Sequence, residues 1–296
     1  MILIPRAKHD FNIRALSLYF VLLTLMRIIR KDQVRPKKSL GQHFLHDQHI
    51  ANKIVEALVV GKDRISVLEI GPGMGVLTAY LLKMDKVDLQ VVEIDRDSVA
   101  YLKQHYPTLT GDKLIEGDFM EMDMATVLPS KVSIIGNFPY NISSQIFFKV
   151  LSNRHQVDQV VCMLQKEVAE RMASKEGNKT YGILSVILQA YYNIEILFKV
   201  SPGVFIPPPN VMSAVIRLER NNTERLDCDE ELFVKVVKQG FNMRRKTLRN
   251  ALKNLNLPAE ITVLEIFNKR AEQLTVHSFV QLTKLIEQSR EGASTN

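Results

Sequence analysis

The sequence predicts an α/β fold, namely a mainly parallel, doubly wound sheet followed by a small all-α domain. Short apolar runs alternate with amphipathic stretches between about residues 65 and 165, and this alternation is typical of β-α-β units in a parallel sheet. A glycine-rich turn directly follows the first apolar run, as in Rossmann-like folds. Only helical patterns follow residue 224, which predicts that the chain ends in a helical domain.

The individual elements are predicted from hydrophobic periodicity. Asp47 is suited to cap a first helix, because a short acceptor side chain can take a free backbone N–H of the first turn. Helical spacing then follows the first strand through Leu81, the second through Leu102 and the fourth over 143–151. The final strand is expected to be antiparallel. The predicted strands are 65–70, 89–94, 113–116, 132–136, 157–164, 194–200 and 211–218.

The domain boundaries are predicted from changes in composition. The polar stretch Asn221–Glu224 is interpreted as a linker between a sheet domain of residues 26–219 and a helical domain of residues 224–288. Residues 289–296 are expected to form a polar, frayed tail. The predicted helices of the second domain cover 232–252, 259–267 and 278–286.

Residues 1–25 are interpreted as a non-native or disordered extension, with Met26 as the true start. The run 15–26 is mostly apolar and follows basic residues, as in a signal peptide, but no cleavage site comes after it. The run is also shorter than the ~20 residues that a membrane-spanning helix needs. We therefore expect a cytoplasmic protein without a membrane partner.

The composition favours a polyanionic partner. The 296 residues carry a formal net charge of +7, and an excess of Lys and Arg favours nucleic acid, although ordinary surfaces can show it too. Cys162 and Cys228 match neither a disulfide framework nor a zinc pattern, and no metal is expected. Cys162 lies within an apolar run, which predicts a buried, unreactive thiol.

The glycine-rich turn predicts a nucleoside cofactor, because glycines let the backbone approach a ligand closely. Glycines stand at Gly71, Gly73 and Gly75, but the third glycine of a dinucleotide motif would fall on Val76. A carboxylate at Glu69 would repel a pyrophosphate and suit the sulfonium and ammonium groups of S-adenosylmethionine. The alternative for Glu69 is a solvent-facing strand end.

Two further acids follow predicted strands at the same edge of the sheet. Glu93 lies about 20 residues after the glycines, where a carboxylate can accept both ribose hydroxyls; this spacing alone does not separate a nicotinamide cofactor from S-adenosylmethionine. Asp118 could accept from the adenine amine, with Phe119 packed nearby, or could belong to a simple turn. Asp95 is expected to cap the next helix.

The segment Asn137–Tyr140 (Asn-Phe-Pro-Tyr) predicts methyl transfer to an exocyclic amine of a nucleobase. The side-chain oxygen of Asn137 and the carbonyl of Pro139 would accept the two amine hydrogens, and the ring of Tyr140 would stack on the base. Phe205 could cover the other face of the base or could simply pack in the core. The base must be unpaired or flipped out of its stack to reach such a pocket.

Taken together, the motifs resemble those of the ribosomal RNA adenine N6-dimethyltransferases, and within them the bacterial small-subunit enzymes. The resemblance covers about residues 34–285, and its parts follow one another in the order seen in that family. They are Lys38–Leu45, Glu69–Gly75, Glu93–Asp95, Gly117–Asp118, Asn137–Ser143 and Phe205–Val211.

The resemblance implies a Rossmann-like methyltransferase domain that binds S-adenosylmethionine. Its substrate would be two adjacent adenosines in the 3′-terminal hairpin loop of small-subunit (16S) rRNA, both dimethylated within an immature 30S particle by a monomeric enzyme. His43 stands where many members have Asn, and Phe138 stands where Leu is usual. The expected cofactor contacts are His43, Leu45, Glu69, Gly71, Gly73, Glu93, Asp118 and Asn137.

Basic residues predict where the RNA binds. A run without acidic residues extends from Lys235 to Lys253, and a phosphate backbone would relieve the repulsion among its like charges. A second basic cluster stands beside the cofactor motif; the alternative for both groups is a solvated surface without a partner. The expected RNA contacts are Arg35, Lys37, Lys38, Lys235, Lys238, Arg244, Arg245, Lys246, Arg249 and Lys253.

Three alternatives stay open at the level of sequence. A large-subunit (23S) rRNA methyltransferase of the macrolide-resistance type would share the core motifs, although the long C-terminal portion favours the small-subunit enzyme. A non-catalytic assembly factor could bind the same particle, but the intact Asn137–Tyr140 segment favours activity. A nicotinamide-dependent dehydrogenase is disfavoured by the glycine spacing.

Overall fold

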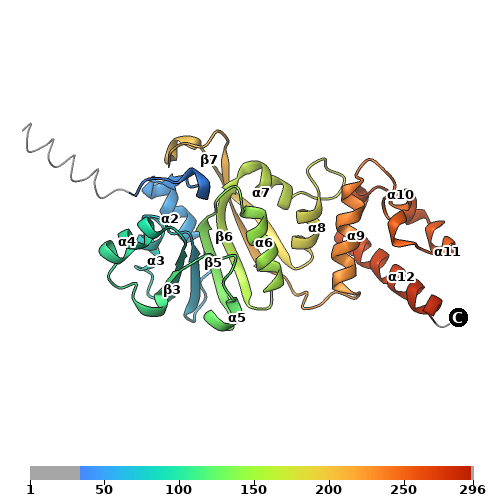
Figure 1. The fold of residues 1–296 in the computed structure, drawn as a ribbon, viewed down its shortest axis with the longest axis horizontal. Coiled ribbons are helices and arrows are strands. Elements are labelled where there is room, and N and C mark those ends of the chain that lie inside the picture. Colours follow the sequence, from blue (N-terminus) through green and yellow to red (C-terminus); the bar gives the residue numbers. More distant parts are fainter. Residues whose placement is uncertain (1–33, 295–296) are drawn as a thin grey trace, which may run out of the picture. The chain divides into compact units, whose positions relative to one another are not determined.

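The structure is a computed structural model, and it describes residues 34–294. The expectations for residues 1–25 and for Met26 lie outside the described residues. The helices and strands of the described residues belong to a compact unit that starts at Pro36, and their order along the chain is shown in Figure 1. Cys162 is fully buried, as predicted, and burial raises the pKa of its thiol.

The sheet domain alternates strands and helices as predicted (3-10 helices are labelled η). Asp47 and Asp95 cap the helices that follow them, because their side chains accept from Ile50 N and Asp97 N. Its elements are η1 (Lys38–Leu40), β1 (Phe44–Leu45), α2 (Gln48–Glu56), β2 (Ile65–Ile70), α3 (Thr78–Leu81), β3 (Val87–Glu93), α4 (Arg96–His105), η2 (Gly111–Lys113), β4 (Leu114–Glu116), α5 (Met124–Val127), β5 (Val132–Asn137), α6 (Ser143–Ser152), β6 (Val157–Gln165), α7 (Lys166–Met172), α8 (Ile183–Gln189), β7 (Tyr192–Val200), η3 (Pro202–Val204), β8 (Phe205–Ile206) and β9 (Ser213–Arg220).

The strands form a seven-stranded sheet in the order β4-β3-β2-β5-β6-β9-β7. Neighbours from β4 to β6 are parallel, whereas β9 runs antiparallel to both β6 and β7. The structure therefore confirms the mainly parallel sheet with an antiparallel final strand. The chain leaves β2 toward β3 and β4 and later returns to β5 on the other side of β2. Such a change of direction opens a crevice at the carboxyl ends of the strands.

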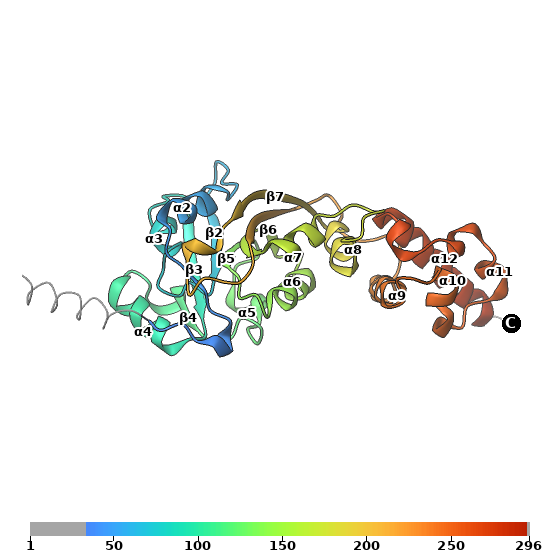
Figure 2. The same cartoon turned by 90° about the horizontal axis from the view of Figure 1, so that it is seen from above.

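Helices cover both faces of the sheet. Apolar residues of α2, α3 and α4 pack on one face, and those of α5, α6, α7 and α8 pack on the other; Figure 2 shows α2 and α3 across the strands from α5 and α6. This two-sided cover explains why the central strands read as nearly continuous apolar runs rather than as alternating ones.

A separate two-stranded sheet joins the start of the described chain to the proline-rich loop. In it β1 pairs antiparallel with β8, with Phe44 opposite Ile206 and Leu45 opposite Phe205. The sequence did not predict this pair, because two-residue strands carry no periodicity. It brings residues 43–46 beside residues 203–207, more than 150 positions later.

The C-terminal part is all helical, as predicted, but its helices are more broken than the sequence suggested. The predicted helix over 232–252 stops at Asn242, because the chain turns back there. After the turn, Leu248 packs against Gly240 of α9, and the N–H of Leu248 donates to Lys269 O. The predicted boundary between residues 219 and 224 stays a prediction. The elements are α9 (Glu230–Asn242), α10 (Leu248–Ala251), η4 (Lys253–Leu255), α11 (Ala259–Thr262), η5 (Glu265–Asn268), η6 (Ala271–Gln273) and α12 (Val276–Ser294).

Two further segments differ from the sequence prediction. The predicted helix over 259–267 divides at Leu264, whose backbone is extended, and this break lets Phe267 reach the core, where it is fully buried. The last helix continues to Ser294, well into the predicted tail. Within residues 34–294, no helix combines the length and the apolar character needed to cross a membrane.

The close approach of β2 and β5 can be tested at Gly136. A Cβ atom at this position would lie 2.6 Å from the carbonyl oxygen of Ile70 and 3.1 Å from the ring of Phe138. We expect Gly136→Ala to lower the free energy of unfolding by roughly 1–3 kcal/mol, measured by urea denaturation. Gly61→Ala is the control, because nothing lies within 4 Å of its added Cβ; equal stability of the two variants would contradict the tight β2–β5 contact.

Candidate functional site

The main cavity lies at the carboxyl edge of the sheet, where the crevice between β2 and β5 opens. Its volume is about 230 Å³, and it is lined by residues that follow β2, β3, β4 and β5. The segment 39–44 forms a further wall. The structure therefore brings together the loops that carry the predicted glycine, acid and Asn-Phe-Pro-Tyr motifs.

Two glycines shape the first wall of the cavity. Gly71 and Gly73 have φ angles of +64° and +58°, which favour glycine strongly. An added Cβ at Gly73 would lie 2.8 Å from the ring of Phe44, whereas one at Gly71 would meet nothing within 4 Å. The loop thus packs tightly against the segment before α2 at Gly73 and leaves open space at Gly71.

Glu93 lies at the end of β3 with its carboxylate held by backbone N–H groups. The side chain is 4% exposed, and its two oxygens accept from Gly73 N at 3.0 Å and Asp95 N at 2.9 Å. Burial raises the pKa of Glu93, although these hydrogen bonds oppose the rise. Because each oxygen keeps a second lone pair, the carboxylate can still accept from two hydroxyl groups in the cavity.

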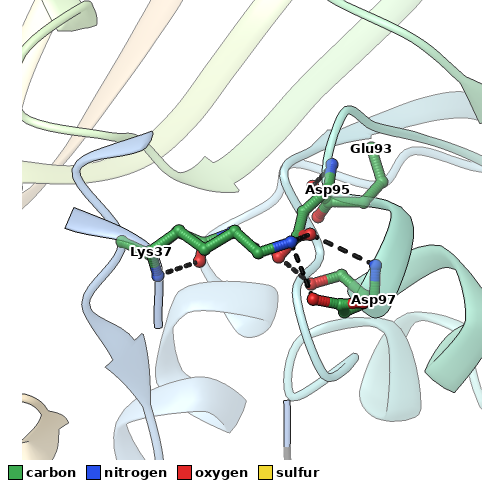
Figure 3. Close-up of polar contacts among 6 residues, drawn as sticks. Lys37, Glu93, Asp95 and Asp97 are labelled. Carbon is green, nitrogen blue, oxygen red and sulfur yellow. Dashed lines mark hydrogen bonds and ion pairs between the residues drawn. The ribbon is translucent and has the colours of Figure 1, made fainter. Parts of the chain in front are cut away.

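A lysine fastens the segment 39–44 to the loop after Glu93. Lys37 Nζ forms ion pairs with Asp95 and with Asp97, the latter at 2.7 Å, and Figure 3 shows its side chain extended toward both carboxylates. Gln42 donates to the other oxygen of Asp95 at 3.1 Å. Burial opposes ionisation of Asp95, but the hydrogen bonds from Lys37 and Gln42 outweigh it and lower the pKa of this carboxyl. Lys37, predicted to contact RNA, therefore serves as a counter-ion within the protein.

Asp118 forms a tight turn after β4. Its Oδ1 accepts from Met120 N at 2.8 Å, and its carbonyl accepts from Met122 N at 3.1 Å. The second carboxylate oxygen has no other partner among the described residues, so it can accept from an amine in the cavity. Ile94 and Phe119 also line the cavity, and they offer it apolar surface.

Glu69 lies behind the glycine loop rather than in the main cavity. It is 1% exposed and accepts from the Thr78 hydroxyl at 2.6 Å. Burial raises its pKa to about 8, so the carboxyl is largely protonated at neutral pH in this structure. Glu69 and Leu45 line a small second cavity of about 30 Å³, which Asn137 also borders and which has room for a water molecule.

Asn137 is oriented by the backbone of the segment 39–44. Its Nδ2 donates to the carbonyl of His43 at 2.8 Å. The amide therefore turns its other end, the Oδ1 acceptor, away from that carbonyl, and Asn137 lines both cavities. A neutral acceptor with a fixed direction thus stands where the sequence predicted one.

The carbonyl of Pro139 is already engaged. It accepts from Ile142 N at 3.2 Å, in the turn that leads into α6. By contrast, no donor to the carbonyl of Phe138 is found among the described residues, although its N–H donates to Met163 O at 3.0 Å. The Phe138 carbonyl is therefore the freer acceptor of the two, whereas the sequence reasoning named the Pro139 carbonyl as the second acceptor of the amine.

Tyr140 stands between the main cavity and an open hollow of about 520 Å³. Its hydroxyl bonds Ser213 Oγ at 2.5 Å, and burial raises its pKa. The His43 ring stacks beside it, with centroids 5.5 Å apart and planes inclined by 28°. His43 Nδ1 donates to Pro207 O at 2.7 Å. The His43 side chain therefore faces Tyr140, not only the cavity where the cofactor was expected.

Phe205 lies in the core rather than in the site. Its ring is 2% exposed and packs within the apolar cluster on the α2 face of the sheet. It lines neither the main cavity nor the hollow beside Tyr140. This placement agrees with core packing, the alternative that the sequence left open for Phe205, and not with stacking on a base.

The residues around the main cavity suit a cationic nucleoside better than a pyrophosphate. None of the lining residues, all of which belong to the described part of the chain, is Lys or Arg, whereas Glu93 and Asp118 are acids. Phosphate sites use cationic side chains or free helix N-termini. The set found here instead offers acceptors for hydroxyl and amine groups, which are the groups that S-adenosylmethionine carries.

The predicted RNA contacts fall into two groups. Several guanidinium and ammonium groups have partners within the protein: Arg244 donates to Asn178 O, Arg249 donates to Thr262 O and Asn268 Oδ1, and Lys238 lies over the Phe148 ring. Arg35 lies outside the compact unit, and its role stays a prediction. The remaining residues are exposed and show no such partner within residues 34–294: Lys38, Lys235, Arg245, Lys246 and Lys253.

Comparisons with known proteins agree with this geometry. The sequence model of one family, described as "Ribosomal RNA adenine dimethylase", matches residues 33–288. A Cytophaga hutchinsonii protein named "Ribosomal RNA small subunit methyltransferase A" is 58% identical over 255 residues, which cover 86% of this chain and 98% of that protein. A Flavobacterium johnsoniae protein of the same name is 54% identical, with 86% and 97% covered.

Solved structures show the same fold. A dimethyladenosine transferase from Plasmodium falciparum superposes with a TM-score of 0.68 and 27% identity, covering 84% of this chain and 98% of that one. The 23S rRNA methyltransferase ErmE gives a TM-score of 0.59 with 24% identity, covering 81% and 99%. At that identity the second likeness concerns the fold alone.

The raised pKa of Glu69 can be tested through the pH dependence of stability. Because the folded protein holds this proton up to about pH 8 and an unfolded chain releases it near pH 4.5, ionisation of the unfolded chain destabilises the fold as pH rises between these values. We expect Glu69→Gln, which keeps an acceptor for Thr78, to gain stability relative to the parent from pH 5 to 8. The gain should reach at most roughly 5 kcal/mol and then level off. Urea titrations of the ligand-free proteins measure it, and a pH-independent difference would contradict the assigned protonation.

Proposed function

The chain belongs to the ribosomal RNA adenine dimethylase family and is a methyltransferase, and on that premise we propose that it dimethylates the N6 amines of two adjacent adenosines in the 3′-terminal hairpin loop of small-subunit (16S) rRNA. The observation that carries this proposal is the orientation of Asn137. Its amide is fixed by the His43 carbonyl, its oxygen has no donor among the described residues, and Asn137 and Tyr140 line the same cavity. A target base stacked on Tyr140 would present its amine to that oxygen.

The cofactor of this reaction is proposed to be S-adenosylmethionine, which supplies the methyl group on an activated sulfonium. Glu93 would accept from the ribose hydroxyls and Asp118 from the adenine amine. The glycine loop would border the methionine part, where Gly71 leaves open space. Ionisation of Glu69 in the presence of a cation would add attraction from behind the loop.

The protein's own groups would act mainly by positioning the amine. Its lone pair is delocalised into the purine ring, and two neutral acceptors favour a more tetrahedral nitrogen. Asn137 Oδ1 is the first acceptor, and the Phe138 carbonyl, with a remaining lone pair on the Pro139 carbonyl, supplies the second. The new N–C bond would form as the S–C bond breaks and leaves a neutral thioether, and the amine would then lose its proton to water. In-line positioning of this kind contributes much of the rate in group transfer.

The partner is proposed to be rRNA within an immature 30S particle, met in the cytoplasm by a monomeric enzyme. The relatives' names support the small subunit as the substrate. The exposed basic residues of α9 and of the turn before α10 would contact phosphates. The likeness to ErmE concerns the fold and lends no weight to a large-subunit substrate.

The deciding experiment maps the modified nucleotides. The protein is incubated with S-adenosylmethionine labelled in its methyl group and with small subunits from cells that lack this modification. We expect label on two neighbouring adenosines near the 3′ end of 16S rRNA. Label confined to large-subunit RNA, or no label at all, would overturn the proposed substrate.

The amine geometry can be tested at Asn137. We expect Asn137→Ala to reduce methyl transfer on the order of 100-fold or more, because the amine loses an oriented acceptor, while the melting temperature stays within a few degrees. Asn52→Ala serves as the control, since the Asn52 side chain donates to Glu56 on the same helix α2 and lines neither cavity. Transfer near the parental rate in the Asn137 variant would show that another group holds the amine.

The division among the basic residues can also be tested. We expect the double variant Arg245→Glu, Lys246→Glu to bind the particle roughly tenfold or more weakly and to show a salt dependence reduced by about two phosphate contacts. S-adenosylmethionine binding should not change. The control double variant Lys103→Glu, Lys131→Glu changes the net charge equally at two exposed lysines that already form ion pairs. Equal loss in both doubles would indicate a general charge effect rather than a contact.

A further inference from the structure

We infer that Lys149 is a positioning residue for the cofactor's adenine, although it does not line the cavity. Lys149 lies in the last turns of α6, the helix that begins directly after the Asn137–Tyr140 segment. Its ammonium donates to the carbonyl of Met120 at 2.8 Å and to the carbonyl of Met122. Both carbonyls belong to the turn that Asp118 begins.

The turn is held from two sides. On the inner side, Asp118 accepts from Met120 N through Oδ1 and from Met122 N through its carbonyl. On the outer side, the Lys149 ammonium donates to the carbonyls of Met120 and Met122. It also lies 5.2 Å from the centroid of the Phe119 ring. Lys149 is thus the side chain that connects this turn to a helix.

Burial of the Lys149 ammonium costs solvation free energy, and its hydrogen bonds to the turn offset this cost. The side chain is partly buried, and burial lowers its pKa, while Asp118 and Asp123 oppose that shift. A hydrogen bond from a cation contributes more free energy of stabilisation than one from a neutral donor. Loss of the Lys149 ammonium would leave the carbonyls of Met120 and Met122 without this donor. Without it, the turn keeps its internal hydrogen bonds and the apolar packing of Phe119, Met120 and Met122 but no hydrogen bond to α6, so the direction of the free Asp118 oxygen is less well defined.

The same helix connects the cofactor loop to the catalytic segment. Ile142 N donates to Pro139 O, and Ile146 N donates to Ile142 O. The turn that contains Tyr140 therefore continues directly into α6. One helix is therefore joined to the turn of Pro139 and Tyr140 at its start and to the turn of Asp118 near its end. This inference rests on the proposed cofactor site, but it concerns Lys149 alone.

The charge of the cofactor gives the test a direction. S-adenosylmethionine carries a net positive charge at neutral pH, so removal of a nearby cation would strengthen its binding if Lys149 acted through charge alone. If Lys149 acts by positioning the turn, the same substitution weakens binding. It also weakens binding of S-adenosylhomocysteine, which is neutral overall, by the same factor.

Calorimetric titration of both ligands tests the inference. We expect Lys149→Met to weaken each about tenfold, Lys149→Gln to weaken them less because one donor group remains, and Lys149→Arg to bind nearly as the parent does. The control Lys131→Met removes an exposed lysine paired with Asp158 and should change neither affinity. Should Lys149→Met fail to fold, Lys149→Gln and Lys149→Arg give the same comparison.

A double-mutant cycle with Asp118→Ala then separates positioning from general loss of stability. Because Lys149 acts through the turn of Asp118, Lys149→Met should cost little further affinity once Asp118 is alanine. Additive losses, or binding of S-adenosylmethionine by Lys149→Met that equals or exceeds the parent's, would overturn the inference. If the parent protein itself binds neither ligand, the proposed function fails instead.

Discussion

The hydrogen bond from Asn137 Nδ2 to the His43 carbonyl is the contact on which the site depends. It joins the end of β5 to a segment almost 100 residues earlier in the chain, and it decides which end of a symmetric-looking amide faces the substrate. The segment can supply that carbonyl only because it is fastened on both sides, by β1–β8 pairing after His43 and by the Lys37–Asp95 ion pair before it. The chemistry at the strand end therefore depends on contacts that lie outside the sheet.

Three buried acids near the cavity differ in the direction or cause of their pKa shifts because their partners differ. Among the described residues Glu69 accepts from Thr78 alone, which does not offset its burial and the nearby Glu93, and it is largely protonated at neutral pH. Glu93 receives two backbone N–H groups, which only partly offset its burial. Asp95 has a lysine as a partner, and its pKa falls below the usual value. Burial alone would raise all three pKa values, so the specific donors, rather than depth, set the charge of the site.

The sequence indicated which residues lie at the carboxyl ends of the strands, but it could not indicate which side chains are engaged by tertiary contacts. Glu93, Asp118 and Asn137 follow apolar runs, and parallel strands bring their carboxyl ends to one edge whatever the details of packing. Lys37 and Phe205 were assigned by residue type, and only the folded chain shows that one pairs with acids and the other enters the core. The sequence reasoning named the carbonyl of Pro139 as an acceptor rather than that of Phe138, since every residue has a carbonyl and only the fold decides which one lacks a donor.

The position of α6 has a consequence for how the two substrates bind. The helix starts at the turn of Pro139 and Tyr140 and reaches the Asp118 turn through Lys149. If a base stacked on Tyr140 shifts the start of the helix, the Asp118 turn must move with it, because a short helix with one face packed in the core moves as a body. Linkage then requires the effect to be mutual, so a cofactor that orders the Asp118 turn would favour the base by the same factor.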